Sequence, residues 1–539
     1  MSTATVPRPM AARMVGGQVR YAVTDYWRAR VVAALSFLFP LAWLLLIGSM
    51  AGNEVLDEST GLRVMQFATP GALVMGALYA TVPTMAITVT DARETGVLKR
   101  LRGTPLPMTA YLIGRAAAAV IFALAAVLAT LTLAVAAYDV QVPGRTAGAA
   151  VGTLALAVIC FVALGLGISA LCRTTTVANA VSVGGVVVLS FISGHFTVGG
   201  TLPEPVNRVA DLFPVKPLTE ALQTQFDPAV RGSGWDLEAL AILLLWTVAG
   251  TALGVWGLRR REVTGGATRP QMTRPAMAPS VTPLHAEVPG RPATRQLVTA
   301  QTVVAVKAMW RDPAAVFFAV VLPVGLFALV AADNTAVSTA DGVPLTVFLA
   351  AGMIAWGVAV TCLMNLPESV VQARDRGVLK RLRGTPLTPG LYVAGRLVAA
   401  IVLAIVIAAL VLALGTLVYD VPVTGLGPAI GVLALGSLTM TACGMLLAAV
   451  VRNARSFGAV ALIVLLPMSF VSDVFTVGGP RWMQTLGSIL PLKHLQNALT
   501  DVMAGTAGAG TWGHLAVLAA WALVAGALAL RFFHWHGKD

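Results

Sequence analysis

The sequence predicts an all-α polytopic membrane protein built from two tandem six-helix units, with twelve transmembrane helices in total. Three observations support this prediction. Of the 539 residues, 57% are hydrophobic and only 11% are charged, and the mean hydropathy is +0.82. The apolar residues form long continuous runs, and the two halves of the chain repeat the same motifs in the same order.

Helices are the expected secondary structure of these runs. A soluble domain carries roughly 25% charged residues, so this chain must lie mostly in a medium without water. About 20 apolar residues in a helix cross the hydrocarbon core, and only helices and closed barrels satisfy their backbone polar groups there. The runs lack the alternation of polar and apolar residues that a barrel strand requires, which favours helices.

An internal repeat organises the chain. Residues 96–106 and 377–387 both read GVLKRLRGTPL, which chance cannot explain. The same register then aligns further pairs of identical residues: Tyr111 with Tyr392, Gly114 with Gly395, Arg115 with Arg396, and, with small gaps, FTVGG at 196–200 with FTVGG at 475–479. We call residues at equivalent positions of the two copies twins.

Each copy contains six apolar runs, which we interpret as spans one to six. They lie near residues 33–50, 66–90, 108–137, 147–172, 177–196 and 237–258 in the first copy, and near 315–332, 345–367, 391–418, 427–451, 456–474 and 512–532 in the second. Residues 1–261 therefore form the first unit and residues 296–539 the second. Residues 262–295 between them are rich in Pro, Thr, Ala and Gly, and predict a flexible cytoplasmic linker.

The placement of charge predicts the topology. With both termini in the cytoplasm, most of the 37 Lys and Arg residues face the cytoplasm and most of the 24 Asp and Glu residues face outward. The net charge of +13 is thus explained by topology and does not indicate nucleic-acid binding. Residues 1–20 lack an apolar core, so we expect no cleavable signal peptide and a multi-pass protein of the plasma membrane.

A cytoplasmic loop between spans two and three, at 91–105 and 372–386, predicts a short amphipathic helix. Leu98 and Leu101 share one face, while basic residues occupy the others. Gly103 is expected to end the helix in the left-handed conformation, and Pro105 to stop it. Such a helix can present a basic, leucine-bearing face to a cytoplasmic partner. Taken alone, the basic cluster is equally explained by helix orientation or by contact with anionic lipid.

Comparison of the two copies favours a docking role for these loops. The neighbouring third spans, at 116–137 and 397–418, agree at few positions, whereas the loops match in Gly, Leu, Thr and Pro as well as in charge. Orientation by charge would tolerate any arrangement of Lys and Arg. We therefore expect both loops to fit the same surface, as two copies of one soluble subunit would offer.

At these loops the chain resembles the ABC-2 type permeases, whose half-units have six spans and a loop of the form E-x-G-x-L-x-R-L-R-x-T-P-L. Residues 94–106 carry this pattern, and residues 375–387 carry it with Asp in place of Glu. The resemblance implies that both loops are coupling helices seated in a separate ATPase. The fused two-unit form resembles actinobacterial antibiotic exporters of the tetronasin type. The resemblance implies these ATPase-docking residues: Arg93, Glu94, Gly96, Leu98, Lys99, Arg100, Leu101, Arg102, Thr104 and Pro105, with their twins Arg374, Asp375, Gly377, Leu379, Lys380, Arg381, Leu382, Arg383, Thr385 and Pro386.

No catalytic or metal site is predicted on this chain. It lacks a G-x-x-x-x-G-K-[ST] loop, and its four cysteines have no metal-ligand spacing. We therefore expect no cofactor on this chain, and ATP with Mg²⁺ on the partner subunit. His195 and Asp473, near the outer ends of the fifth spans, and Asp139 and Asp420, after the third spans, are interpreted as interfacial polar residues. No clear ionisable residue falls at a midplane, where an ion-coupled carrier usually needs one.

Aromatic and methionine residues in spans two and five are candidates for a substrate pathway, although many of them also fit plain helix packing. These candidates are Met75, Tyr79, Met85, Phe191, Trp356, Met364, Met468 and Phe470.

The sequence thus predicts the permease subunit of an ATP-driven exporter that moves an amphipathic or apolar small molecule, antibiotic or drug-like, out of the cell. The expected partners are two copies of an ABC nucleotide-binding ATPase subunit, the lipid bilayer and a small-molecule cargo, without nucleic acid. Two alternatives stay open: an ion-coupled secondary multidrug carrier, and a non-transporting membrane scaffold or sensor that uses the same ATPase.

Overall fold

The computed structural model is almost entirely helical over the part of the chain that it describes. That part comprises residues 8–28, 30–58, 60–101, 103–194, 204–263, 293–332, 337–339, 342–382, 385, 387–422, 424–451, 454–475 and 479–532. A short antiparallel pair, β1 (Val55–Asp57) and β2 (Leu62–Arg63), joins the first two spans. The prediction of an all-α fold is confirmed.

Every predicted span corresponds to a helix. In the first unit these are α2 (Arg30–Ala51), α3 (Val64–Glu94), α5 (Met108–Tyr138), α6 (Ala147–Leu171), α7 (Thr175–Ile192) and α10 (Leu237–Val263). In the second unit, span one comprises α12 (Pro313–Val316), the π-helix η1 (Phe317–Val321) and α13 (Leu322–Ala331), and span two comprises α14 (Leu345–Ala359), the π-helix η2 (Val360–Asn365) and α15 (Leu366–Asp375). Spans three to six are α17 (Pro389–Val418), α18 (Leu426–Val450), α19 (Ala454–Val471) and α22 (Ala509–Phe532).

Ten of the described helices are long and apolar enough to cross a membrane. Shorter apolar segments, Phe37–Ala51 and Ser456–Val471, occupy the positions of the other two predicted spans, in α2 and α19. The twelve positions therefore agree with the predicted polytopic fold of two six-helix units.

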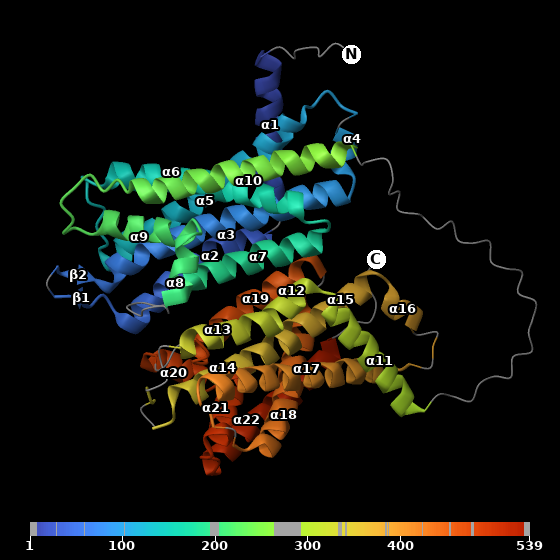
Figure 1. The fold of residues 1–539 in the computed structure, drawn as a ribbon. Coiled ribbons are helices and arrows are strands. Elements are labelled where there is room, and N and C mark those ends of the chain that lie inside the picture. Colours follow the sequence, from blue (N-terminus) through green and yellow to red (C-terminus); the bar gives the residue numbers. More distant parts are fainter. Residues whose placement is uncertain are drawn as a thin grey trace, which may run out of the picture.

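The remaining helices are shorter or more polar than the spans. Helices α1 (Arg8–Arg28) and α11 (Thr294–Trp310) precede the two units, and α4 (Val97–Leu101) and α16 (Val378–Leu382) are the helices of the predicted loops. Between spans five and six lie α8 (Glu204–Asp211) and α9 (Val215–Phe226) in the first unit and α20 (Arg481–Gly487) and α21 (Pro491–Ala504) in the second. Figure 1 shows α4 and α16 on one side of the bundle, here called the loop side, and α9, α20 and the β1–β2 pair on the opposite side. We call this opposite side the hairpin side, after the helical hairpins α8–α9 and α20–α21 between spans five and six.

The structure bears on two parts of the predicted domain organisation: the linker and the segment before each unit. The predicted linker falls mainly on residues 264–292, which lie outside the described residues, and its ends belong to α10 and α11. Helices α1 and α11 were not anticipated, because their mixed polar and apolar sequence lacks the long apolar run of a span.

Both π-helical segments precede a proline of the second unit. Pro323 lies two residues after η1, and Pro367 lies two residues after η2. Proline has no N–H to donate, and its ring crowds the carbonyl four residues earlier, which disturbs the regular helical ladder. We attribute the local widening to these prolines. Segments of this kind are frequent at functional sites.

The third spans end alike in both units. Asp139 and Asp420, interpreted above as interfacial residues, follow α5 and α17 with φ of 54° and 51°. Asp is one of the residues that tolerate this left-handed conformation. The neighbouring tyrosines pack on the first spans: Tyr138 contacts α2 at Gly48, and the Tyr419 hydroxyl donates to the carbonyl of Ala328 on α13 at 2.7 Å. The end of span three is thus fixed to span one.

We predict that the loop side faces the cytoplasm. Ser233, between α9 and α10, and Thr104, after α4, are both exposed and lie on opposite sides. In intact cells, an impermeant thiol reagent should label the Ser233→Cys protein and spare the Thr104→Cys protein, which should react only after permeabilisation. The parent chain, whose cysteines are buried or half-buried, is the control. Labelling of both variants in intact cells would contradict this topology.

Candidate functional site

In each predicted loop, a glycine in the left-handed conformation directly precedes the short helix. Gly96 has φ of 75° and Gly377 has φ of 68°. This conformation costs other residues roughly 1–2 kcal/mol, so glycine is favoured where the chain turns from span two into α4 or α16. The expectation that Gly103 would be left-handed was wrong: its N–H donates to the Arg100 carbonyl at 3.1 Å in an ordinary turn. The chain reverses before the short helix and not after it.

The leucines of the loops pack against the permease itself. Leu98 is 5% exposed and contacts Ala92 of α3 and Tyr111 of α5. Its twin Leu379 is 4% exposed and belongs to the core that includes Tyr392. These leucines therefore hold the short helices onto the ends of spans two and three. The expected leucine-bearing face is turned inward.

The outward face of each loop is basic. Lys99 and Arg100 are exposed in the first loop, and their twins Lys380 and Arg381 are exposed in the second. Among the described residues, none of these four side chains forms an ion pair. Two equivalent cationic surfaces are thus presented on the loop side.

Arg93 and its twin Arg374 bind the end of span four. Arg93 donates through Nη1 to the Ser169 carbonyl at 2.8 Å, and through Nη2 to the Cys172 carbonyl. Arg374 donates to the carbonyls of Ala448 and Val451 at 3.4 and 3.2 Å. The last carbonyls of a helix lack intrahelical partners, so each arginine caps span four and ties it to the base of the loop.

Glu94 ties the loop to span five. Its Oε2 accepts from both the backbone N–H and the hydroxyl of Thr175, each at 2.7 Å. Thr175 is the first residue of α7, where free N–H groups favour a carboxylate. In the second unit the twin Asp375 lies 3.8 Å from Nε of Arg374. Glu94 and Arg93 together join spans two, four and five at the base of the first loop.

The other residues predicted to dock have the following locations. Leu101 and Leu382 are half-buried, Thr104, Pro105 and Thr385 are exposed, and Arg102, Arg383 and Pro386 lie outside the described residues. The structure therefore places the candidates in three groups: buried supports, caps that hold the loop's base, and an exposed surface that is mainly basic.

Helices α1 and α11 pack on the third spans and were missed by the sequence analysis. Each crosses span three at a glycine: a Cβ on Gly114 would lie 2.5 Å from Gln18 Cβ, and a Cβ on Gly395 would lie 2.5 Å from Gln301 Cβ. Arg115, which follows Gly114, pairs with Asp25 of α1 at 2.7 Å. The repeated Tyr-x-x-Gly-Arg pattern at 111–115 and 392–396 was the feature of the sequence that could have indicated a helix packed on span three.

The two units meet at an aromatic cluster. Phe475 of the second unit lies 4.9 Å from Trp356, 5.2 Å from Phe470 and 6.3 Å from Phe191 of the first unit, measured between ring centroids. Phe470 also contacts Trp43 of α2 at 5.4 Å. The twin of Phe475, Phe196, lies outside the described residues, as do His195 and the rest of the first FTVGG segment. Aromatic side chains thus fill the junction beside the ends of the fifth spans.

A cleft opens on each side of this junction. One, of about 510 Å³, lies between α2 and α19 and is lined by Phe39, Trp43, Tyr138 and Phe470 among others. The other, of about 450 Å³, lies between α7 and the first span of the second unit and is lined by Phe191 and Tyr419 among others. The two clefts are related by the repeat, since each joins span one of one unit to span five of the other.

The predicted pathway residues divide between these clefts and the helix interior. Phe191 and Phe470 line the clefts. Met75, Met85, Trp356 and Met468 are buried, and Tyr79 and Met364 are half-buried. Met85 faces Gly165 of α6 within the first unit, away from the junction. The sequence did not show which face of span two is turned toward the other unit.

Family comparison agrees with this architecture. Residues 19–226 match the model of the ABC-2 type transporter, and residues 317–531 match the model of the ABC-2 family transporter protein. The chain belongs to the ABC-2 type permeases. No curated protein matches the chain significantly.

The two matches lie in tandem, one in each unit, so this ABC-2 permease has the fused two-unit form. Such permeases are the membrane subunits of ABC transporters. They are not themselves enzymes, and they work with an ABC ATPase. The permease is a multi-pass membrane protein, in agreement with its apolar helices. The two halves match different models of the family, which parallels the divergence of their spans.

We predict that Gly96→Ala loosens the first loop and Gly103→Ala does not. The first change forces alanine into a left-handed conformation, at a cost of about 1–2 kcal/mol. At Gly103 an added Cβ would make only an ordinary contact, 3.4 Å from the Arg100 carbonyl oxygen. Hydrogen exchange of the amides in α4 should accelerate in the first variant alone. Equal exchange in both variants would show that the turn at Gly96 does not hold the loop.

Proposed function

We propose that this permease is the membrane subunit of an ATP-driven exporter that moves an amphipathic or apolar small molecule, antibiotic or drug-like, out of the cell. Two copies of an ABC ATPase dock on the two loops. Closure of the ATPase dimer upon nucleotide binding rocks one unit against the other, and the cargo leaves between the units.

The observation that supports docking is the pair of exposed basic surfaces at Lys99, Arg100, Lys380 and Arg381. Both lie on the loop side, and each is fixed to the spans by a buried leucine and a capping arginine. A surface that receives force must be joined firmly to the element that it moves. A basic cluster that only oriented helices would need no such anchoring.

The two clefts beside the aromatic junction support an apolar or amphipathic cargo. Their walls are aliphatic and aromatic, with only a few polar groups such as the hydroxyls of Ser49 and Tyr138 in the larger cleft. Clefts of 450 and 510 Å³ are within the range of small-molecule sites. Because each cleft joins both units, rocking of the units would change its shape.

An ion-coupled carrier is the main alternative. Such a carrier needs an ionisable side chain within its spans, and Glu368 of α15 is mostly buried, with Gln372 donating to it at 3.2 Å. Glu368 lies in the part of span two near the loop side, and its twin in the first unit is Ile87, which cannot ionise. ATP-dependent export without a proton gradient would separate the exporter from the carrier, and transport itself would separate it from a scaffold or sensor.

We predict that Arg100→Glu combined with Arg381→Glu weakens ATPase binding while cargo binding persists. Reversal of charges buried at an interface with the ATPase should cost about 2–5 kcal/mol per lost contact. The measurement is co-purification of the ATPase alongside cargo binding in detergent. Arg208→Glu, on the exposed hairpin-side helix α8, is the matched control and should leave ATPase binding intact. If the double variant loses cargo and keeps the ATPase, the loops are a substrate entrance instead.

We also predict that one permease chain binds two ATPase chains, because one chain supplies both loops. Native mass spectrometry of the purified complex should give this ratio. The single variants Arg100→Glu and Arg381→Glu should each leave one ATPase bound more strongly than the other. A stable complex with equal numbers of the two chains would overturn the assignment of both loops, unless it contains a second type of ATPase.

A further inference from the structure

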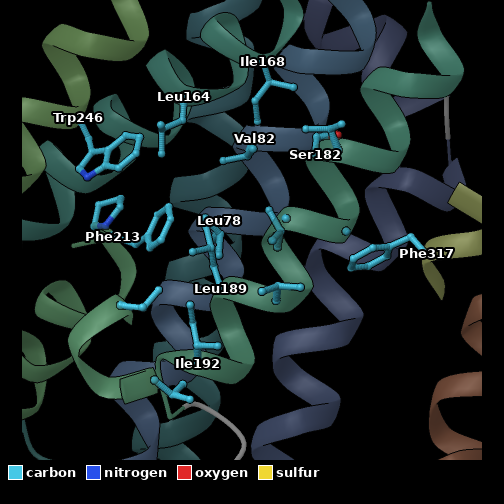
Figure 2. Close-up of a pocket in the computed structure, with 18 of the residues that line it drawn as sticks. Leu78, Val82, Leu164, Ile168, Ser182, Leu189, Ile192, Phe213, Trp246 and Phe317 are labelled. Atoms are coloured by element: carbon cyan, nitrogen blue, oxygen red, sulfur yellow. The ribbon is translucent and has the colours of Figure 1, made fainter. Parts of the chain in front are cut away.

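A large apolar cavity in the first unit adjoins the inter-unit cleft beside α7, with which it shares Val188, Ile192, Val206 and Phe317. It has a volume of about 780 Å³ and lies among α3, α6, α7, α10 and the α8–α9 hairpin. Figure 2 shows Leu78, Val82, Leu164 and Leu189 around its inner part, with Phe213 and Trp246 at one end and Phe317 of the second unit at another. Along α7 the lining runs from Val181 to Ile192, a distance of about 17 Å at the rise of an α-helix.

The cavity walls offer no free hydrogen-bonding side chain. Ser182 donates to the Ala178 carbonyl of its own helix at 2.6 Å, and the Trp246 Nε1–H donates to the Leu212 carbonyl at 2.8 Å. The other lining side chains are aliphatic or aromatic, and none is ionisable. A ligand that fits these walls is therefore apolar along its length.

One glycine of α7, Gly185, leaves the space open, whereas a Cβ on its neighbour Gly184 would lie 2.9 Å from the Phe317 ring of the second unit. Gly184 and Gly185 of α7 line the cavity, and a Cβ on Gly185 would meet no atom within 4 Å. The repeat aligns Ser190-Phe191 with Ser469-Phe470, so the twins of the two glycines are Ile463 and Val464. In the second unit, branched side chains thus stand where the first unit has none. The small residue that leaves this space open thus occurs in α7 and not at the twin position of α19.

The rim of the cavity faces the bilayer. Val181 and Val188 of α7 and Val209 of α8 line it and are 47%, 37% and 50% exposed. Helix α8 carries charged residues beside exposed Val209 and Leu212, the pattern of a helix that lies in the headgroup interface. The hairpin end of the cavity is therefore at headgroup depth, and its inner part is at the depth of the acyl chains.

We propose that this cavity binds one acyl chain of a lipid from the hairpin-side leaflet. The chain enters beside α8 and lies along α7 over Gly185, next to Phe317. If the cavity stayed empty, the side chains that line it would lose dispersion contacts. Lipid hydrocarbon lies next to its rim, so an acyl chain is available to fill it. Because Phe317 belongs to the second unit and lies beside Gly184, the bound chain touches both units. This inference does not depend on ATP-driven export.

The test uses the full chain in nanodiscs that contain a phosphatidylglycerol with a diazirine at the middle of one acyl chain. After illumination, mass spectrometry should find adducts on peptides of α7 and α10 well above those on α19. Gly185→Leu, which fills the cavity, should lower the α7 and α10 adducts several-fold. Val464→Leu, the matched change at the twin position, should leave them unchanged.

Gly185→Val, which places the twin's residue in the cavity, is a smaller second variant and should lower the adducts less than Gly185→Leu. Size-exclusion profiles of all variants should match the parent. Equal labelling of α7 and α19, or labelling of α7 that is unaffected by both Gly185 variants, would overturn the proposal. Displacement of the adducts by an uncharged hydrophobic drug present far below the lipid concentration would assign the cavity to cargo and also overturn it.

Discussion

The fold of each unit depends on one close contact between a glycine of span four and the backbone of span two. A Cβ on Gly165 would lie 2.7 Å from the Val82 carbonyl oxygen, and a Cβ on its twin Gly444 would lie 2.6 Å from the Leu363 carbonyl oxygen. Within a bilayer, apolar helices gain little from leaving lipid, so their association relies on close packing of this kind. The contact also places the end of span four beside the end of span two. Arg93 and Arg374 can reach the terminal carbonyls of span four only because of this placement.

The two units keep this shared frame and differ in what surrounds it. The loops, their left-handed glycines and their capping arginines occur in both copies. Among the described residues, π-helical segments occur in the second unit only, and the wide cavity at Gly185 belongs to the first. Two identical partners would require two identical surfaces, whereas a single cargo in the centre meets each unit from a different direction. The pattern of agreement and divergence fits a permease whose docking face is symmetric and whose lumen is not.

Much of this architecture could be predicted because it follows from single-residue properties. The apolar runs predicted a helix at each of the twelve span positions, and ten of these helices are long and apolar enough to cross a membrane. The repeat located both loops. Three details could not be read from the sequence because they depend on tertiary packing. The direction of Leu98 is set by Tyr111, which lies on another helix. The left-handed residue of each loop depends on where span two ends, and both candidate positions of the first loop, Gly96 and Gly103, are glycine. The inward position of Met85 depends on which face of α3 meets α6.

Span five is the element that joins the proposed docking surface to the inter-unit junction. At its loop-side end in the first unit, α7 is held by Glu94 through Thr175. Near its hairpin-side end it carries Phe191, which faces Phe475 of the second unit. Its 18 residues span about 27 Å as a helix.

A helix transmits displacement along its axis with little change in its own length, since its backbone hydrogen bonds keep the rise per residue nearly constant. If the ATPase shifts the base of the first loop, Glu94 passes that shift to α7, and the aromatic contact at Phe191 must slide or separate. The same geometry places Gly185 midway along the helix that would move, so an acyl chain lying over Gly185 would meet a wall that shifts with the transport cycle.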